Sequence, residues 1–178
     1  MNVYKVTMRW LLVVKDHFTG LTYLAAIPKK RVSFVAHELC LMFGLCGYPS
    51  ILHTDNGIEF MSKEIVAAVK ELNKQISMVT VQPRKPSDQG SVESRNKLLK
   101  KLIKSEENIQ IVRGEIPNWT KTLGKVMSAV NSYQQCSAYE AVFGMKYHLE
   151  YFCTDLEMYK CLTVTDRLHV CYDEYIER

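Results

Sequence analysis

The chain has 178 residues, of which 47% are hydrophobic and 10% aromatic, and its net charge is +4. This composition suits one compact domain with a hydrophobic core, and it excludes a wholly disordered chain. No uncharged run reaches the roughly 18 residues that a membrane span needs. The apolar run "LLVV" (11–14) is too short for the core of a signal peptide. We therefore expect a soluble intracellular protein that does not contact membranes.

The first half of the chain predicts strands and a helix in alternation. Two apolar runs, 9–16 and 21–27, are separated by "HFTG" and predict a β-hairpin. Ser33 is expected to cap a helix that ends near Leu45, because "GLCGYP" then supplies glycine and proline. The apolar residues 50–54 predict a short buried strand.

The middle of the chain continues this alternation. Ser62 is expected to cap a second helix, 76–81 predicts a further strand, and the prolines and glycine of 82–90 predict a loop. Three helices are predicted after that loop, at about 91–105, 119–133 and 138–144. Strands interleaved with helices predict an α/β domain in which helices pack on a mixed sheet.

Charge is distributed unevenly along the sequence. Residues 84–104 carry seven Lys or Arg against two acidic residues, a net charge of +5, whereas residues 150–178 have a net charge of −4. A basic segment in an otherwise neutral domain is typical of proteins that bind polyanions. The same segment can also be only a solvated helix face.

The cysteines give no clear metal-binding spacing. The sequence contains six of them and no CxxC pair. A zinc site is conceivable from residues near the end of the chain, namely Cys153, Cys161, Cys171, His148 and His169. Reduced thiols in a cytosolic or nuclear protein are the interpretation that we favour.

The predicted helix at 91–105 has a charged side and an apolar side. At 100° per residue, Glu93, Lys97, Lys100 and Lys104 fall within about 60° of one another. The residues on the apolar side are Val92, Leu99, Leu102 and Ile103. A helix-dipole contact and an i, i+4 ion pair with Lys97 are sufficient to explain Glu93. They do not explain why the lysines continue along the same side.

A second carboxylate follows the short strand, in "HTDNGIEF" (53–60). Asp55 is a turn residue by one reading, because Asp-Asn-Gly is ordinary turn chemistry. By the other reading it is a metal ligand at the end of a buried strand. Two hard oxygen ligands, Asp55 and Glu93, with lysines beside them are what a Mg²⁺ site that acts on phosphodiesters requires.

Several segments together resemble a known family. "LLVVKDHFTG", "HTDNGIEF" and "PSDQGSVESRNKLLKKLI" resemble successive blocks of the catalytic core of retroviral and retrotransposon integrases. "NWTKTLGKVMSAVNS" and "SAYEAVFG" resemble the segment that follows this core in gypsy-type retroelements and in host genes derived from them. The resemblance covers about residues 9–146 and implies a ribonuclease-H-like fold.

The resemblance also implies roles for individual residues. Asp55 and Glu93 match the second and third acidic residues of the D,D(35)E triad, which binds Mg²⁺ or Mn²⁺. Asn56 follows the metal-binding Asp. The positions that match DNA-contacting residues are Gln89, Lys97 and Lys100, and Lys104 extends their row.

The sequence departs from the family pattern at three places. The separation of Asp55 from Glu93 is 37 residues rather than 35, and Ala138 replaces a usual proline. The first acidic residue of the triad has no match, because Asp16 falls near the hairpin turn and the preceding residues 1–8 contain no Asp or Glu. The sequence therefore predicts a first strand that is shortened or lacks its catalytic Asp. We interpret Met1 as the start of a truncated copy, a spliced fragment or a partial gene model.

These observations leave two functional hypotheses open. The first is an integrase-type polynucleotidyl transferase, impaired in this chain or active only when a longer isoform supplies the missing Asp. The second is a domesticated, non-catalytic module for DNA binding or dimerisation. The resemblance implies DNA as a partner, a homodimer, and a nuclear or cytoplasmic protein that is not secreted. We expect an integrase-like domain at 1–146 and an acidic tail of open structure at 147–178.

Overall fold

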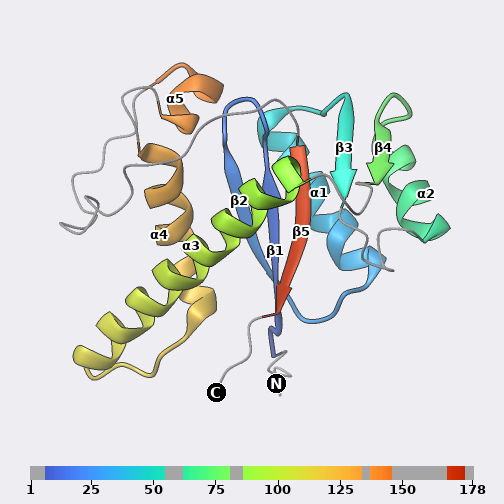
Figure 1. Ribbon diagram of the computed structural model, residues 1–178. Coiled ribbons are helices and arrows are strands. Elements are labelled where there is room, and N and C mark those ends of the chain that lie inside the picture. The colour runs from blue at the N-terminus through green and yellow to red at the C-terminus, as the bar shows by residue number, and fades with distance from the viewer. Residues whose placement is uncertain (1–6, 55–61, 81–85, 134–136, 146–167, 175–178) are drawn as a thin grey trace.

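A computed structural model describes residues 7–54, 62–80, 86–133, 137–145 and 168–174 (Figure 1). The strands are β1 (Trp10–Lys15), β2 (Thr22–Ile27), β3 (Ile51–Thr54), β4 (Ser77–Thr80) and β5 (Leu168–Glu174). The helices are α1 (Val32–Cys46), α2 (Lys63–Leu72), α3 (Pro86–Val112), α4 (Trp119–Ser132) and α5 (Ala138–Phe143). The order up to α5 is the one that the sequence predicted. β5 is additional, since the sequence left the structure of 147–178 open.

All five strands form one mixed sheet, in the order β2-β1-β5-β3-β4. β1 and β2 form the predicted antiparallel hairpin, and β3 pairs with β4 in parallel. β5 lies between the two pairs. It is antiparallel to β1, with Lys15 opposite His169, and parallel to β3, with His53 also opposite His169. β5 therefore connects the two halves of the sheet, because β1 and β3 are not neighbours.

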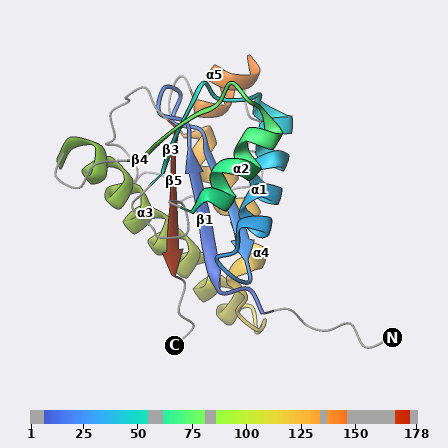
Figure 2. The same ribbon diagram turned by 90° about the vertical axis from the view of Figure 1, so that its right-hand side faces the viewer.

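Helices cover both faces of the sheet (Figure 2), where α1 and α2 lie on one side of the strands and α3 on the other. Alternate residues of β1 serve the two cores. Leu12 and Val14 pack in a cluster with residues of α1 and α2, whereas Leu11 and Val13 pack in a cluster with residues of α3 and α4. β1 is thus buried on both faces of the sheet.

Local signals explain most helix ends. Ser62 caps α2 as predicted, since its Oγ accepts a hydrogen bond from the Ile65 amide at 3.3 Å. α1 ends at Gly47, whose φ of 86° suits glycine. The prediction that Ser33 caps α1 is wrong, because α1 begins at Val32, and its first flanking residue, Arg31, makes no side-chain cap.

Helix α3 is longer than predicted at both ends. Residues 86–90, which the sequence predicted as loop, are helical. Pro86 is the first residue of the helix, where a backbone N–H would have no partner within the helix, so proline is tolerated there. At the other end no glycine or proline intervenes until Gly114, whose φ is 74°. In Figure 1 the helix runs obliquely from beside β5 to the lower left, past the edge of the sheet at β2.

Helix α4 is held on the sheet by a pair of buried hydrogen bonds. The Asn131 side chain accepts from the Thr22 amide and donates to the Thr22 carbonyl, each at 2.8 Å. Buried amide groups of this kind are costly to leave unpaired, so the pair fixes α4 against β2. No helix in the described part of the chain is long and apolar enough to cross a bilayer.

Candidate nucleic-acid interface

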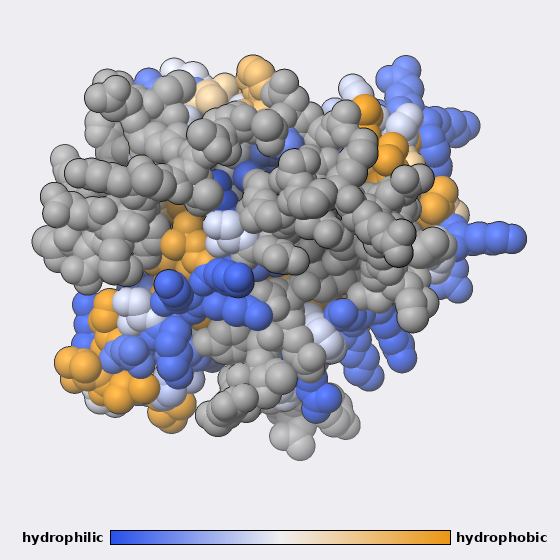
Figure 3. All heavy atoms as spheres, viewed as in Figure 1, coloured by the Kyte–Doolittle hydropathy of each residue, from blue (hydrophilic) through white to orange (hydrophobic). Residues whose placement is uncertain are grey.

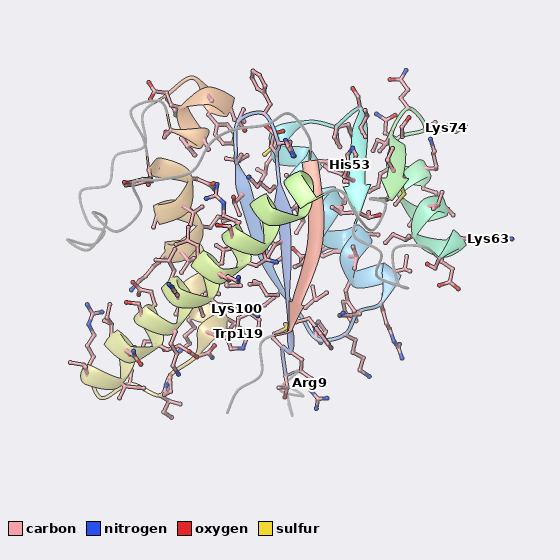
Figure 4. All side chains as sticks on the ribbon, viewed as in Figure 1. Arg9, His53, Lys63, Lys74, Lys100 and Trp119 are labelled. Carbon is pink, nitrogen blue, oxygen red and sulfur yellow. The ribbon has the colours of Figure 1, made fainter. Side chains whose placement is uncertain are left out.

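The two sides of α3 differ as the sequence predicted. Leu99 and Ile103 are fully buried, in one cluster with Leu11 and Val13 of β1. Leu102 packs against the same cluster and is partly buried. The opposite side presents exposed lysines, namely Lys97, Lys100 and Lys104. We call these three residues the basic stripe. Figure 4 shows Lys100 on α3, and hydrophilic residues gather over this helix in Figure 3.

Within the basic stripe, the ion pair of Lys104 with the described part of the chain is weak. The Lys104 ammonium lies 4.0 Å from the Glu107 carboxylate, and the lysine side chain is 69% exposed. An ion pair that long and that exposed contributes little. The neighbouring carboxylate, Glu106, is directed to Lys125 of α4 at 3.5 Å. The face of α3 therefore carries positive charge that a phosphate backbone can approach.

The two predicted metal ligands are only partly located. Asp55 and Asn56 lie outside the described residues and directly follow β3, which ends at the buried Thr54. Glu93 and Gln89 belong to α3, but their side chains also lie outside the described part. Whether the two carboxylates meet stays a prediction. Among the described residues, no group of three or more His, Cys, Asp or Glu can hold a metal ion.

Asp16 lies where the sequence expected it, at the hairpin turn. Its carboxylate accepts hydrogen bonds from the Thr19 amide at 3.1 Å and from the Thr19 hydroxyl at 2.5 Å. A third, longer contact of 3.4 Å comes from the Phe18 amide. These bonds hold the turn, so the carboxylate of Asp16 is used structurally.

β5 lies between β1 and β3. Its register determines which residues lie level with the end of β3. Thr54 is opposite Val170, and Val13 of β1 is opposite Cys171. The two acidic residues of β5 come later: Asp173 is opposite Leu11, and Glu174 is opposite Trp10. No acidic position of β5 therefore lies level with the end of β3.

Basic residues instead occupy one row across the centre of the sheet. Lys15, His169 and His53 are in register on β1, β5 and β3. Lys15 is buried, and the pKa of its ammonium is lowered to about 8 by burial and by the nearby Arg95, with Asp16 acting in the opposite direction. Burial also lowers the pKa of Arg95, whose Nε atom is buried and has no hydrogen-bond partner among the described residues.

Sequence reasoning missed Lys15 and Arg95. Lys15 ends an apolar run and was counted with the strand, and Arg95 was counted with the basic charge of 84–104. At 100° per residue, however, Arg95 falls within about 40° of Leu99, on the core side of α3. That angle was the available signal. His17 and His53 are both buried.

The sequence is similar to parts of much longer proteins. Over 145 residues it is 29% identical to the Pro-Pol polyprotein of feline foamy virus, and the match covers 79% of this chain and 12% of the polyprotein. Over 143 residues it is 28% identical to the human KRAB-A domain-containing protein 2, covering 78% of this chain and 28% of that protein. The chain thus spans a small part of these relatives, and no family model matches it.

The fold is similar to two solved viral structures. The first is a chain of the simian T-cell lymphotropic virus intasome in complex with PP2A regulatory subunit B56 gamma, with a TM-score of 0.62, 25% identity, and 77% of this chain and 49% of that chain covered. The second is the catalytic core domain of BIV integrase, with a TM-score of 0.59, 22% identity, and coverage of 75% and 85%. The chain therefore has a retroviral integrase-like core domain of the ribonuclease-H-like fold, as the resemblance predicted.

We expect Lys15→Met to stabilise the protein at pH 7. The folded state then no longer buries a charge beside Arg95. In the unaltered chain the unfolded state keeps its proton up to the ordinary pKa of 10.5, whereas the folded state loses it near 8. Stability of the unaltered chain should therefore rise with pH between these values, by about 3 kcal/mol at most. Urea unfolding of both chains at pH 7 and pH 9.5 measures this.

Lys104→Met, at an exposed side chain, serves as the control, because it keeps Lys15 and its stability should rise with pH as that of the unaltered chain does. If Lys15→Met is less stable than the unaltered chain at pH 7 and the gap does not change with pH, burial does not lower the pKa of the Lys15 ammonium, and the account of Lys15 is wrong.

Proposed function

We propose that this chain is an integrase-like domain that binds DNA along α3 and has little or no strand-transfer activity. The observation that carries the proposal is the exposed basic stripe on a helix whose other side is locked into the core of an integrase-like fold. A rigid helix holds its lysines in fixed positions, which suits recognition of a repeating phosphate backbone. Binding then depends on charge more than on sequence.

The spacing of the stripe suits a nucleic-acid strand. Lys97 and Lys104 are seven residues apart, which is about 10 Å along a helix axis. This length corresponds to about three nucleotide steps of one DNA strand. Lys100 lies between them on the same side. We infer that the stripe contacts two or three successive phosphates, and that Gln89 and Asn56 lie close to the same strand.

A metal site in this chain would be built from Asp55 and Glu93. Mg²⁺ or Mn²⁺ bound there would polarise a phosphodiester and activate the attacking oxygen. The residues present fit one such ion better than two. Next to the end of β3, β5 offers the positions of Val170 and Cys171 rather than an acidic residue, and the buried Lys15 adds positive charge to the adjoining row. The weakened site is our reason for proposing impaired catalysis.

The alternative is a domesticated, non-catalytic module. The similarity to the human KRAB-A domain-containing protein 2 is the observation that favours it, because that relative is a host protein and not a viral polyprotein. Under this alternative the domain keeps DNA binding or dimerisation and needs no metal. A nuclear location and a homodimer fit both versions and stay predictions.

The basic stripe is tested with Lys97→Glu combined with Lys100→Glu. We expect the affinity for duplex DNA to fall more than tenfold at 0.1 M salt, and the slope of log affinity against log salt to fall by about 2, since each phosphate contact contributes about 0.9. Fluorescence anisotropy with a labelled duplex measures both. The matched control is Lys63→Glu with Lys74→Glu, which makes the same charge change on and beside α2 (Figure 4). Equal losses in both variants would mean that the stripe is only a solvated face.

The catalytic part is tested by a strand-transfer assay with Mg²⁺ or Mn²⁺. We expect the purified chain to bind DNA yet to give no product above that of Asp55→Ala. The physical reason is that β5 has no acidic position level with the end of β3 that could hold a second cation there. Robust activity that Asp55→Ala and Glu93→Gln both abolish would show that the first ligand comes from a position which we have not identified.

A further inference from the structure

A second basic surface lies at the beginning of β1, away from the row of basic residues at its end. A cavity of about 570 Å³ is lined by Thr7, Arg9, Trp10, Pro28, Lys29 and Lys30. We call it the β1–β2 hollow. Figure 4 shows Arg9 at the lower end of the sheet and His53 near the upper end. The volume is within the range of sites that bind ligands.

The backbone around the hollow is fixed by hydrogen bonds. The Arg9 amide donates to the Ile27 carbonyl at 3.2 Å and so extends the ladder between β1 and β2 by one step. On the other wall the Arg31 amide donates to the Lys29 carbonyl at 2.8 Å, which holds the turn that leads into α1. The cationic side chains therefore project from two rigid segments.

One of the cations is held against an aromatic ring. The Lys30 ammonium lies 4.3 Å from the centre of the Trp10 ring, a cation–π contact. Trp10 also packs against the core cluster beneath α1 and α2. With the core on one side and Lys30 over the ring, Trp10 is poorly placed to stack on a nucleic-acid base. The hollow is therefore suited to phosphate groups rather than to bases.

The described walls of the hollow carry only positive charge. Three of the described lining residues are cationic and none is Asp or Glu, and the backbone register places Glu174 of β5 opposite Trp10. Arg9 and Lys29 are exposed, and neither makes an ion pair with the part of the chain that the structure describes. By contrast, the described residues that line a cavity of about 360 Å³ beside β2 and α4 include no Lys, Arg, Asp or Glu. Like charges gathered around a concavity repel one another unless an anion binds between them.

β1 links the hollow to the helix that carries the basic stripe. Leu11 and Val13 of β1 pack in the same cluster as Leu99 and Ile103 of α3, and Arg9 is only two residues before Leu11. We propose that the β1–β2 hollow is a second phosphate-binding site, which holds the backbone of the same DNA that lies along α3. This inference rests on the proposed function, and the test below separates the two.

The test uses the full chain and a labelled 30-base-pair duplex at several salt concentrations. The hollow variant is Arg9→Gln with Lys29→Gln, which leaves Lys30 on Trp10. The matched control is Lys63→Gln with Lys74→Gln. We expect the hollow variant to bind roughly tenfold more weakly at 0.1 M salt and to lose about 2 from the salt slope, whereas the control changes affinity less than twofold. Lys29→Gln alone, at an exposed side chain, should lose about half of that slope.

The possible outcomes are distinguishable. If the unaltered chain binds no DNA, the proposed function fails and this inference fails with it. A second outcome is that the unaltered chain binds DNA, that the stripe variant loses binding, and that the hollow variant binds as the control does. In that case only the present inference is overturned. A third measurement adds 10 mM inorganic phosphate at constant ionic strength. If phosphate removes the difference between the hollow variant and the control, the hollow binds a small phosphate ligand and the present inference is also overturned.

Discussion

The pairing of β5 with both β1 and β3 is the constraint on which the rest of the structure depends. β5 is a seven-residue strand from near the end of the sequence, and it lies at the centre of the sheet. The hairpin of β1 and β2 carries α4 through the bonds between Thr22 and Asn131, while β3 and β4 lie beyond β5. β5 therefore sets the position of the end of β3 relative to the hairpin against which α3 packs.

The same constraint shapes the chemistry of the site. A strand that brings Val170 and Cys171 level with the end of β3 places no acidic position there, and the row before it is basic. Lysines on α3 and around the β1–β2 hollow are our reason for proposing phosphate binding. The missing acidic position of β5 level with the end of β3, together with the buried Lys15, is our reason for proposing impaired catalysis.

Much of the fold could be predicted from the sequence, because local signals determine it. Alternating apolar runs predicted β1 and β2, Ser62 predicted the start of α2, and the helical spacing of Leu99 and Ile103 predicted the buried side of α3. β5 could not be predicted in this way, because its place depends on two unpaired strand edges that are distant in sequence. The burial of Lys15 was missed for a related reason. A lysine at the end of a strand is usually exposed, and Lys15 is buried only because α3 packs over it.

The most direct test of the central role of β5 is urea unfolding of Val170→Pro. Val170 pairs with both Val14 and Thr54, so proline removes a hydrogen-bond donor in the middle of the sheet. Lys63→Pro is the matched control, since Lys63 is the first residue of α2, where proline is tolerated. We predict that Val170→Pro lowers the free energy of unfolding by about 3 kcal/mol or more and that the control changes it by less than about 0.5 kcal/mol. Equal stability of the two variants would contradict the account.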